Sequence, residues 1–372
     1  MDGRRGESGG DSLPTSDEKS HQVRDRNSSE RPLVSVVIPT YDRPSYLPGA
    51  IETALGQTYD PIEVVVVDDG SETDAAAEIV AEYVDRSTPI SLRVHEDNRG
   101  LSAARNTGIG VASGDVVAFL DDDDRWHETK LERQLAALDR CEEDVGVVSC
   151  CLASVDPSGD LLRAERSKPT GDLREALCRR NVVGSPSRIV VTRDCLDDVG
   201  GFDETLGAKQ DWDLYLRIAE NWRFETVQDI LCYRTIHDDA LSRDAGAAAR
   251  DLMAVREKHE SSIRARGCWN ASMASYHWTV GIAALFDGDR GAGRSHVRQS
   301  FEREPSVGRL LVYASTFVPG AFGVVVALKR WGERALFAEE RARPSSTTVP
   351  GTNDNGGNRW TISQRDQQGE HA

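Results

Sequence analysis

The stretch LVSVVIPTYDRPSYLPGAIETALGQTYDPIEVVVVDDGS, residues 33–71, determines the fold class of this 372-residue chain. It opens with a short β-branched run at 33–38 that a proline closes, and it ends with a second such run at 62–67 that an Asp-Asp-Gly-Ser turn closes. Both runs are typical of buried parallel strands. Residues 46–57, between them, place their apolar side chains on one helical face. The order strand, helix, strand predicts an α/β unit.

The same alternation continues toward the C-terminus. We expect helices over 74–83, 102–109 and 128–138, and strands over 91–94, 116–120 and 145–149. This pattern predicts a Rossmann-like, mainly parallel sheet with flanking helices. Ligands of such sheets bind beyond the carboxyl ends of the strands, which is where Asp68-Asp69 and the run Asp121–Asp124 stand.

Composition excludes several function classes. The chain has 45 Lys and Arg against 62 Asp and Glu, a net charge of −17, which argues against a general nucleic-acid binder because duplex affinity comes chiefly from basic side chains. The hydrophobic fraction of 38% is that of a soluble globular protein. Only six of the basic residues are lysines, and an acidic, lysine-poor surface resembles that of haloarchaeal proteins.

Composition also suggests how the chain is divided. We expect a disordered polar arm over 1–31, an α/β domain over 32–243, a helical region over 244–306, an apolar segment over 307–332 and a disordered polar tail over 333–372. The seven cysteines form no CxxC pair and no secretory signal is visible, so we expect reduced thiols in a cytoplasmic protein.

The acidic run in FLDDDDRW, residues 119–126, is the most informative local feature. Four adjacent carboxylates repel one another and need solvent, arginine partners or a divalent cation. An acidic run is often only a solvated loop, and this alternative stays open. The run directly follows an apolar strand, however, which places hard oxygen ligands at the carboxyl edge of the sheet. Such ligands suit Mg²⁺ or Mn²⁺, and we expect a cation there to bridge two phosphates.

Six motifs in order resemble the family 2 glycosyltransferases of GT-A fold. The resemblance covers residues 33–240, and any one motif alone would be weak. The motifs are VSVVIPTYDR (34–43), VVVVDDGS (64–71), NRGLSAARNTGI (98–109), FLDDDDRW (119–126), VGGFDE (199–204) and QDWDLYLRI (210–218).

The resemblance implies a nucleotide-sugar donor site. Its residues here are Pro39, Thr40, Tyr41, Asp68, Asp69, Arg105 and Asp121. A carboxylate accepts hydrogen bonds from a base N–H or ribose hydroxyls. Two alternatives stay open from the residues alone: Asp68-Asp69 as an ordinary strand-ending turn, and Arg105 as an ion pair at the sheet edge.

A divalent cation, Mg²⁺ or Mn²⁺, is also implied. The family's DxD motif matches Asp121-Asp122-Asp123, with Asp123 the expected direct ligand and Asp124 adjoining it, so the register is ambiguous by one residue. His237, in YRTIHDDALS, stands where many relatives carry a histidine near the metal or diphosphate, although a lone histidine is more often an ordinary surface or core residue.

The catalytic base implied by the family is Asp211, in Gln210-Asp211 at the start of a predicted helix. Inverting transfer needs one carboxylate that takes the proton of the acceptor hydroxyl. A helix-terminal carboxylate with no catalytic role, or Asp213 acting instead, remains an alternative. Two other classes also stay open: a nucleotidyltransferase, although PTYDRPSY (39–46) has no phosphate-loop glycine, and a non-catalytic scaffold.

The C-terminal third does not resemble the family. We expect helices over 247–264, 269–286 and 291–303, and then nineteen uncharged residues over 310–328. As one helix that run is about 28 Å long, nearly a bilayer core, but Pro319-Gly320 interrupts it. It spans a membrane, lies at its surface or forms a buried hairpin.

The acceptor that we expect is a glycan, or a polyprenyl- or dolichol-phosphate-linked glycan of S-layer N-glycosylation, at the cytoplasmic face of the membrane. UDP is the expected nucleotide, and the family motifs do not separate the sugars.

Overall fold

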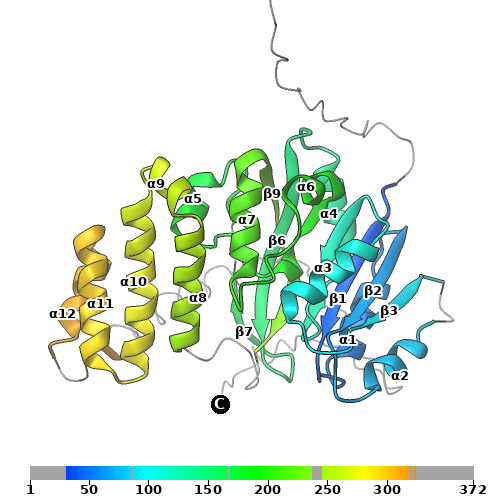
Figure 1. The fold of residues 1–372 in the computed structure, drawn as a ribbon, viewed down its shortest axis with the longest axis horizontal. Helices are drawn as coiled ribbons and strands as arrows, with labels where there is room; N and C mark the ends of the chain where they lie inside the picture. Colours follow the sequence, from blue (N-terminus) through cyan, green and yellow to red (C-terminus); the bar gives the residue numbers. More distant parts are fainter. Residues whose placement is uncertain are drawn as a thin grey trace, which may run out of the picture. The chain divides into compact units, whose positions relative to one another are not determined.

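A computed structural model describes residues 31–84, 87–165, 168–236, 245–318, 320 and 322–323. In these ranges nine strands form one mixed sheet in the order β3-β2-β1-β4-β8-β6-β9-β5, with β7 paired to β6 (Figure 1). The strands are β1 (Val34–Thr40), β2 (Ile62–Asp68), β3 (Ile90–Val94), β4 (Val116–Phe119), β5 (Asp124–Trp126), β6 (Val145–Val155), β7 (Leu161–Ala164), β8 (Val190–Thr192) and β9 (Arg223–Thr235).

The half of the sheet made by β1 to β4 is parallel, as the sequence predicts. One boundary differs, because Pro39 lies inside β1 instead of closing it. The carbonyl of Val37 accepts a hydrogen bond from the N–H of Leu120, just beyond the end of β4. Because backbone groups two residues apart in a strand point to the same side, the nitrogen of Pro39 also points toward β4, but beyond the last residue pair of the two strands. Its missing N–H therefore costs the sheet no ladder bond.

The other half is mixed, and sequence reasoning missed most of it. β6 runs to Val155, beyond the expected end at residue 149, and pairs parallel with β9 and antiparallel with β7 and β8. The β6·β9 ladder changes register near Val227 and Ile230, where the polar residues Gln228 and Asp229 interrupt the apolar pattern. β5 begins inside the acidic run itself.

Helices cover both faces of the sheet (Figure 1). One face packs against α1 (Leu47–Leu55), α2 (Ala75–Ala81) and α4 (Lys130–Leu138). The opposite face packs against α5 (Arg174–Arg179), α6 (Arg193–Val199) and α7 (Gln210–Asn221), and α3 (Leu101–Val111) packs on β1 and β2. Strand alternation sends Val36 to the first core and Val37 to the second. The expected GT-A-like α/β class is confirmed.

The C-terminal part of the described chain is helical, as expected. Its helices are α8 (Ala245–Lys258), α9 (Glu260–Ala265), α10 (Trp269–Phe286), α11 (Arg290–Arg303) and α12 (Val307–Ser315). The single helix expected over 247–264 is divided at His259, whose imidazole bonds to Asp213 of α7. α10 packs along α11 and contacts α5 and α8.

The apolar run over 310–328 does not form one continuous helix, since α12 ends at Ser315. Among the described residues, no helix combines the length and the apolar character needed to cross a bilayer. Residues 1–30 of the expected arm lie outside the described ranges. Residues 324–372, which include the expected tail over 333–372, also lie outside them.

Candidate active site

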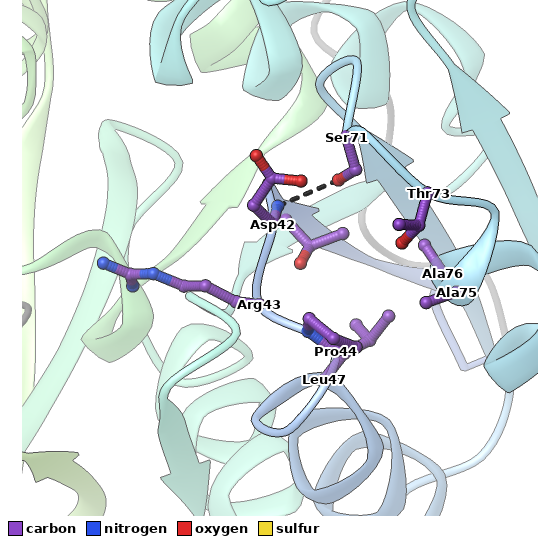
Figure 2. A pocket seen from close by; sticks show the side chains of 9 residues that line it. Asp42, Arg43, Pro44, Leu47, Ser71, Thr73, Ala75 and Ala76 are labelled. Carbon is purple, nitrogen blue, oxygen red and sulfur yellow. Dashed lines mark hydrogen bonds between the residues drawn. The ribbon is translucent and has the colours of Figure 1, made fainter.

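The loops that follow β1 and β2 are tied to each other and enclose a small pocket. The N–H of Asp42 donates to Ser71 Oγ (2.9 Å), and the Asp42 carboxylate accepts from the N–H of Glu72 (2.8 Å). Figure 2 shows the first of these bonds beside the pocket. The pocket is lined by Thr40, Asp42, Arg43, Pro44, Leu47, Ser71, Thr73, Ala75 and Ala76.

The predicted donor residues lie at this edge of the sheet but differ in what they present. Pro39 and Thr40 are buried, whereas Tyr41 is 42% exposed. Asp68 is buried and accepts from the N–H and hydroxyl of Ser71. Asp69 is buried and accepts from three donors, which are the N–H groups of Arg99 and Gly100 and the Nδ1 of His95 at 2.6 Å.

The hydrogen bonds of the two aspartates in this structure are therefore made within the protein. Asp68 closes its own turn, which was the alternative open from the sequence. Asp69 joins the end of β2 to the segment that starts α3, and the second nitrogen of its partner His95 lies 2.8 Å from Thr107 Oγ1 within α3. This network fixes the position of α3, which carries Arg105.

The acidic run is held by buried contacts. Asp122 accepts from Thr40 Oγ1 at 2.8 Å, and Arg43 Nη1 lies 2.9 Å from Asp123 Oδ2 and 3.4 Å from Asp122 Oδ1. Figure 2 shows the Arg43 side chain extending away from the pocket. Arg43 thus joins the β1 loop to the DxD segment by ion pairs that are about four-fifths buried.

Burial and mutual repulsion act on the two buried members of the run. Burial, with the nearby charge of Asp123, raises the pKa of Asp122 to about 7. The same causes raise the pKa of Asp124 well above its usual value, and the Oδ1 atom of Asp124 is buried without a hydrogen-bond partner. The ionised forms of Asp122 and Asp124 are therefore disfavoured, and a bound cation would stabilise them.

Arg105 pairs with the acidic run, which hydrogen bonds connect to the predicted base. The Arg105 side chain is 2% exposed and pairs with Asp121, so it forms the ion pair that the sequence left open as one alternative. The pKa of Asp211 is raised mainly by burial, and the charges of Arg105 and Asp121 make smaller contributions of opposite sign. The Asp121 N–H also donates to Ser187 Oγ at 3.1 Å, and Asn181, in the same segment as Ser187, donates to Asp211. Hydrogen bonds therefore connect the acidic run to Asp211.

Asp211 lies in the first turn of α7, partly buried. Lys209 precedes the helix in the left-handed conformation with φ of 62°, a backbone geometry that non-glycine residues adopt rarely and mostly at special sites. The Asp211 carboxylate accepts from the N–H of Trp212 and from Asn181 Nδ2, each at 2.8 Å. Burial is the main cause that raises its pKa.

Asp213, the alternative base, has a different environment. Its carboxylate is 0% exposed and contacts Arg217, Lys258 and His259 at 2.6–2.9 Å. Hydrogen bonds from His259 and Lys258 hold its pKa far below the usual range despite burial. A carboxylate enclosed in this way has no path to a substrate hydroxyl, and it joins α7 to α8.

The carboxylates fit a divalent cation if substrate phosphates and water supply the remaining ligands. In the ranges that the structure describes, no three Asp, Glu, His or Cys side chains are grouped so that they could hold a metal ion by themselves, and His237 lies outside those ranges. Mg²⁺ is commonly held by one or two carboxylates together with substrate phosphates and water. The disfavoured ionisation of Asp122 and Asp124, and the buried Asp124 Oδ1 atom that has no hydrogen-bond partner within the described ranges, fit a cation held by few carboxylates together with phosphate and water.

Sequence reasoning missed three residues of the site. Arg43, Asn181 and His95 each bond to a predicted site aspartate. Arg43 lies inside the motif at 34–43, and its position as a basic residue just after a strand could have indicated its role. The sequence contains no such indication for Asn181 and His95, because the aspartates that they contact are 30 and 26 residues away.

Comparison with known proteins shows a similarity over the first part of the α/β domain. The family model described as glycosyl transferase family 2 matches residues 35–195. An uncharacterized glycosyltransferase of Rickettsia felis is 30% identical over 218 residues, which are 57% of this chain and 35% of that protein. The chain thus spans about a third of the length of this relative.

Two solved structures share the fold. The mannosyltransferase PcManGT from Pyrobaculum calidifontis, in complex with GDP-Man and Mn²⁺, aligns with a TM-score of 0.54 and 20% identity over 81% of this chain and 84% of its own. S. aureus TarS 1-349, in complex with UDP-GlcNAc, aligns with a TM-score of 0.51 and 20% identity over 80% of this chain and 92% of its own. At this identity the likeness concerns the fold.

Proposed function

We propose that this chain, whose residues 35–195 match the glycosyl transferase family 2 model, is an inverting glycosyltransferase that moves one sugar from a nucleoside-diphosphate sugar to an acceptor hydroxyl. One observation carries the proposal. Asp121 of the DxD segment pairs with Arg105, and its backbone N–H donates to Ser187 Oγ at 3.1 Å. Asn181, in the same segment as Ser187, donates to Asp211 at 2.8 Å, so hydrogen bonds connect the proposed diphosphate-binding segment to the proposed base.

In this proposal the donor lies over the carboxyl ends of β1, β2 and β4. Thr40 and the loops joined by the Asp42–Ser71 bond form the wall on the nucleotide side. Tyr41, Asp68 and Asp69 complete that side, with Asp69 acting through the loop that it holds at Arg99 and Gly100. Asp121 and Asp123 face the diphosphate.

A divalent cation would be held by Asp123 and Asp121, with Asp124 adjoining and His237 as a further candidate. When bound, such a cation neutralises charge on the diphosphate leaving group. Arg43 and Arg105 are the chain's own cations at the same place, and they keep the segment folded around the diphosphate position.

Asp211 is the proposed base. Its carboxylate accepts the proton of the acceptor hydroxyl while that oxygen attacks the anomeric carbon from the face opposite the nucleotide. A raised pKa suits this work, because a base poised closer to neutral pH binds the transferred proton more strongly. Burial around α7 provides that increase.

For the finer identity of the substrates we propose a UDP-linked hexose or hexuronic acid as donor. The proposed acceptor is a dolichol- or polyprenyl-phosphate-linked glycan of S-layer glycoprotein assembly at the cytoplasmic face of the membrane. Support comes from the acidic, lysine-poor composition and from α12.

The surface of α12 supports the membrane part of this proposal. Val307, Leu310, Leu311, Phe317 and Val318 are 46–75% exposed. The spacing of Val307, Leu310 and Leu311 places these three on one side of α12, and Phe317 and Val318 follow shortly after its end at Ser315. Val312 and Ser315 are buried on the other side. An exposed apolar stripe of this kind suits contact with a lipid surface.

Calorimetric titration of UDP, dTDP and GDP, with and without Mn²⁺, tests the donor site. We expect one nucleotide to bind, and we expect binding to need both Mn²⁺ and Asp123, so that Asp123→Ala abolishes it. Asp229→Asn, at an exposed ion pair on β9, is the matched control and keeps wild-type binding. Folded wild-type protein that binds none of the three up to millimolar concentration would favour the non-catalytic scaffold.

A further inference from the structure

Asn181 contacts the proposed base directly. It lies between α5 and the short 3₁₀ helix Pro186–Arg188, and its Nδ2 atom donates to Asp211 Oδ2 at 2.8 Å. No other side chain is recorded as a hydrogen-bond donor to this carboxylate among the described residues, and the other recorded donor is the backbone N–H of Trp212, to Oδ1. The orientation of the Asp211 side chain therefore depends on Asn181.

The direction of the Asn181 amide is fixed by its own loop. Its Oδ1 atom accepts the N–H groups of Val183 (3.0 Å) and Gly184 (2.8 Å). Because backbone N–H groups donate only, the oxygen has to face them, and the NH₂ group has to face Asp211. An NH₂ group donates only, so its partner is favoured in the ionised form, which accepts.

The loop that carries Asn181 is anchored in the core. Gly184 has a φ of +101°, and a Cβ atom there would lie 2.8 Å from Arg188 Nη1. Arg188 is 2% exposed and donates to the carbonyl of Cys150 in β6 and to Glu165. The donor that faces Asp211 is thus supported by the sheet and not by a surface loop alone.

The second oxygen of Asp211 is held from another direction. The backbone N–H of Trp212 donates to Oδ1, and the indole of Trp212, 1% exposed, donates to the carbonyl of Leu177 in α5. Each carboxylate oxygen therefore accepts one hydrogen bond and keeps a further lone pair. Two donors at opposite oxygens fix the plane of the carboxylate.

We infer that Asn181 is a positioning residue for the transfer reaction, one that holds the carboxylate of Asp211 in the orientation and the ionised state needed to accept the proton of the acceptor hydroxyl. This inference rests on the proposed function. Asn181 acts through Asp211 and does not itself touch the reacting atoms.

Two substitutions separate orientation from charge. Asn181→Ala removes the donor, and Asn181→Asp replaces it with a second carboxylate facing the first. Asn221→Ala is the matched control, because Asn221 also donates an amide hydrogen bond to an aspartate, Asp198 at 3.1 Å, at the far end of the same helix. All three variants are checked for folding by thermal unfolding and for donor binding by calorimetry.

For the Asn181 variants we expect kcat to fall about 10- to 100-fold while donor affinity stays within about twofold of wild type. In Asn181→Asp the acid limb of the kcat–pH profile moves up by about one pH unit, because a neighbouring like charge disfavours the ionised base. Asn221→Ala keeps both the rate and the profile.

A second readout needs no substrate. Carbon-13 NMR of labelled aspartate carboxyls, with the Asp211 signal assigned from Asp211→Asn, follows the titration of that group directly. We expect the titration midpoint of Asp211 to rise in Asn181→Asp and to stay unchanged in Asn221→Ala. An unchanged midpoint, or wild-type kcat with a wild-type pH profile in the folded Asn181 variants, overturns the inference. Absence of turnover by the wild-type protein would instead count against the proposed function, and the NMR titration would still decide whether Asn181 controls Asp211.

Discussion

At the scale of single residues, the candidate site depends on arginines that compensate a crowded set of carboxylates. Arg43 reaches from the β1 loop to Asp122 and Asp123, and Arg105 reaches from α3 to Asp121. Each arginine also fastens a loop to the carboxyl edge of the sheet. The arginines that we propose to face a diphosphate therefore also contribute to the stability of the fold.

Arg43→Gln tests this double role. The substitution removes the ion pairs of Arg43 with Asp122 and Asp123, which are mostly buried. We expect the free energy of unfolding to fall by about 1–3 kcal/mol in urea denaturation at neutral pH. Arg133→Gln is the control, because its pair with Asp229 is about half exposed and such pairs contribute less than about 1 kcal/mol. Equal decreases in the free energy of unfolding of the two variants would show that the buried Arg43 ion pairs stabilise the fold no more than an exposed pair does.

The sequence was sufficient to place the site aspartates but not their partners. Asp68 and Asp121 follow strands whose order along the chain was readable, and the carboxyl ends of parallel strands meet at one edge. Arg43 and Asn181 contact aspartates that are 80 and 30 residues away in sequence, respectively. These contacts depend on the three-dimensional arrangement of separate loops, which no local sequence pattern encodes.

At the scale of elements, the parallel half of the sheet was predictable and the mixed half was not. β1 and β2 are continuous β-branched runs of buried residues, which is the strongest single-sequence signal for a strand. β8 has only three residues and β5 starts with an aspartate. β9 mixes buried and exposed residues without regular alternation, so its thirteen residues resemble no simple strand pattern.

The packing of α10 on α11 contains a titratable pair. His277 on α10 is 7% exposed, and its Nδ1 lies 3.0 Å from Nδ1 of His296 on α11. Burial, followed by the charges of Arg303, His296 and Arg256, lowers the pKa of His277 to about 4. The pKa of His296 is also lowered by burial. The native state therefore holds the pair neutral.

This pair predicts acid sensitivity of the folded state. The unfolded chain binds a proton at His277 near pH 6.5, whereas the native state does so near pH 4, so the stability that the neutral form contributes is complete above pH 6.5 and is lost as the pH falls toward 4. We expect wild-type protein to lose roughly 1–3 kcal/mol more than His277→Gln between pH 7 and pH 4.5 in urea denaturation. Parallel pH curves for the two proteins would contradict this assignment.

At the scale of the whole molecule, the chain combines an α/β domain, whose residues 35–195 match the glycosyl transferase family 2 model, with a helical region that this model does not cover. The family motifs and the comparisons agree on the first part. The second part was predictable only as helical, because helical periodicity does not encode which partner covers an exposed face. The apolar stripe on α12 is the most informative feature of that region.

Vesicle sedimentation tests the stripe. We expect Leu311→Ser with Phe317→Ser to weaken binding to anionic phospholipid vesicles at least about tenfold, because burying each side chain contributes roughly 2 kcal/mol. The control is Leu162→Ser with Val94→Ser, since Leu162 is as exposed as Leu311, both at 56%, but belongs to β7. Vesicle binding that is absent in the wild type, or equally weakened by both pairs, would remove the membrane from the proposed function.

The measurement that tests the central claim most directly is release of nucleoside diphosphate from a panel of UDP-, dTDP- and GDP-sugars. It is made with Mn²⁺ and a polyprenyl-phosphate glycan extract, on wild-type protein and on Asp211→Asn. We predict release from one donor class that depends on the extract, with a fall of about a thousandfold or more in Asp211→Asn and unchanged donor binding by calorimetry. Release that folded Asp211→Asn sustains at the wild-type rate would contradict the account, because the proposed base would then take no part in the transfer.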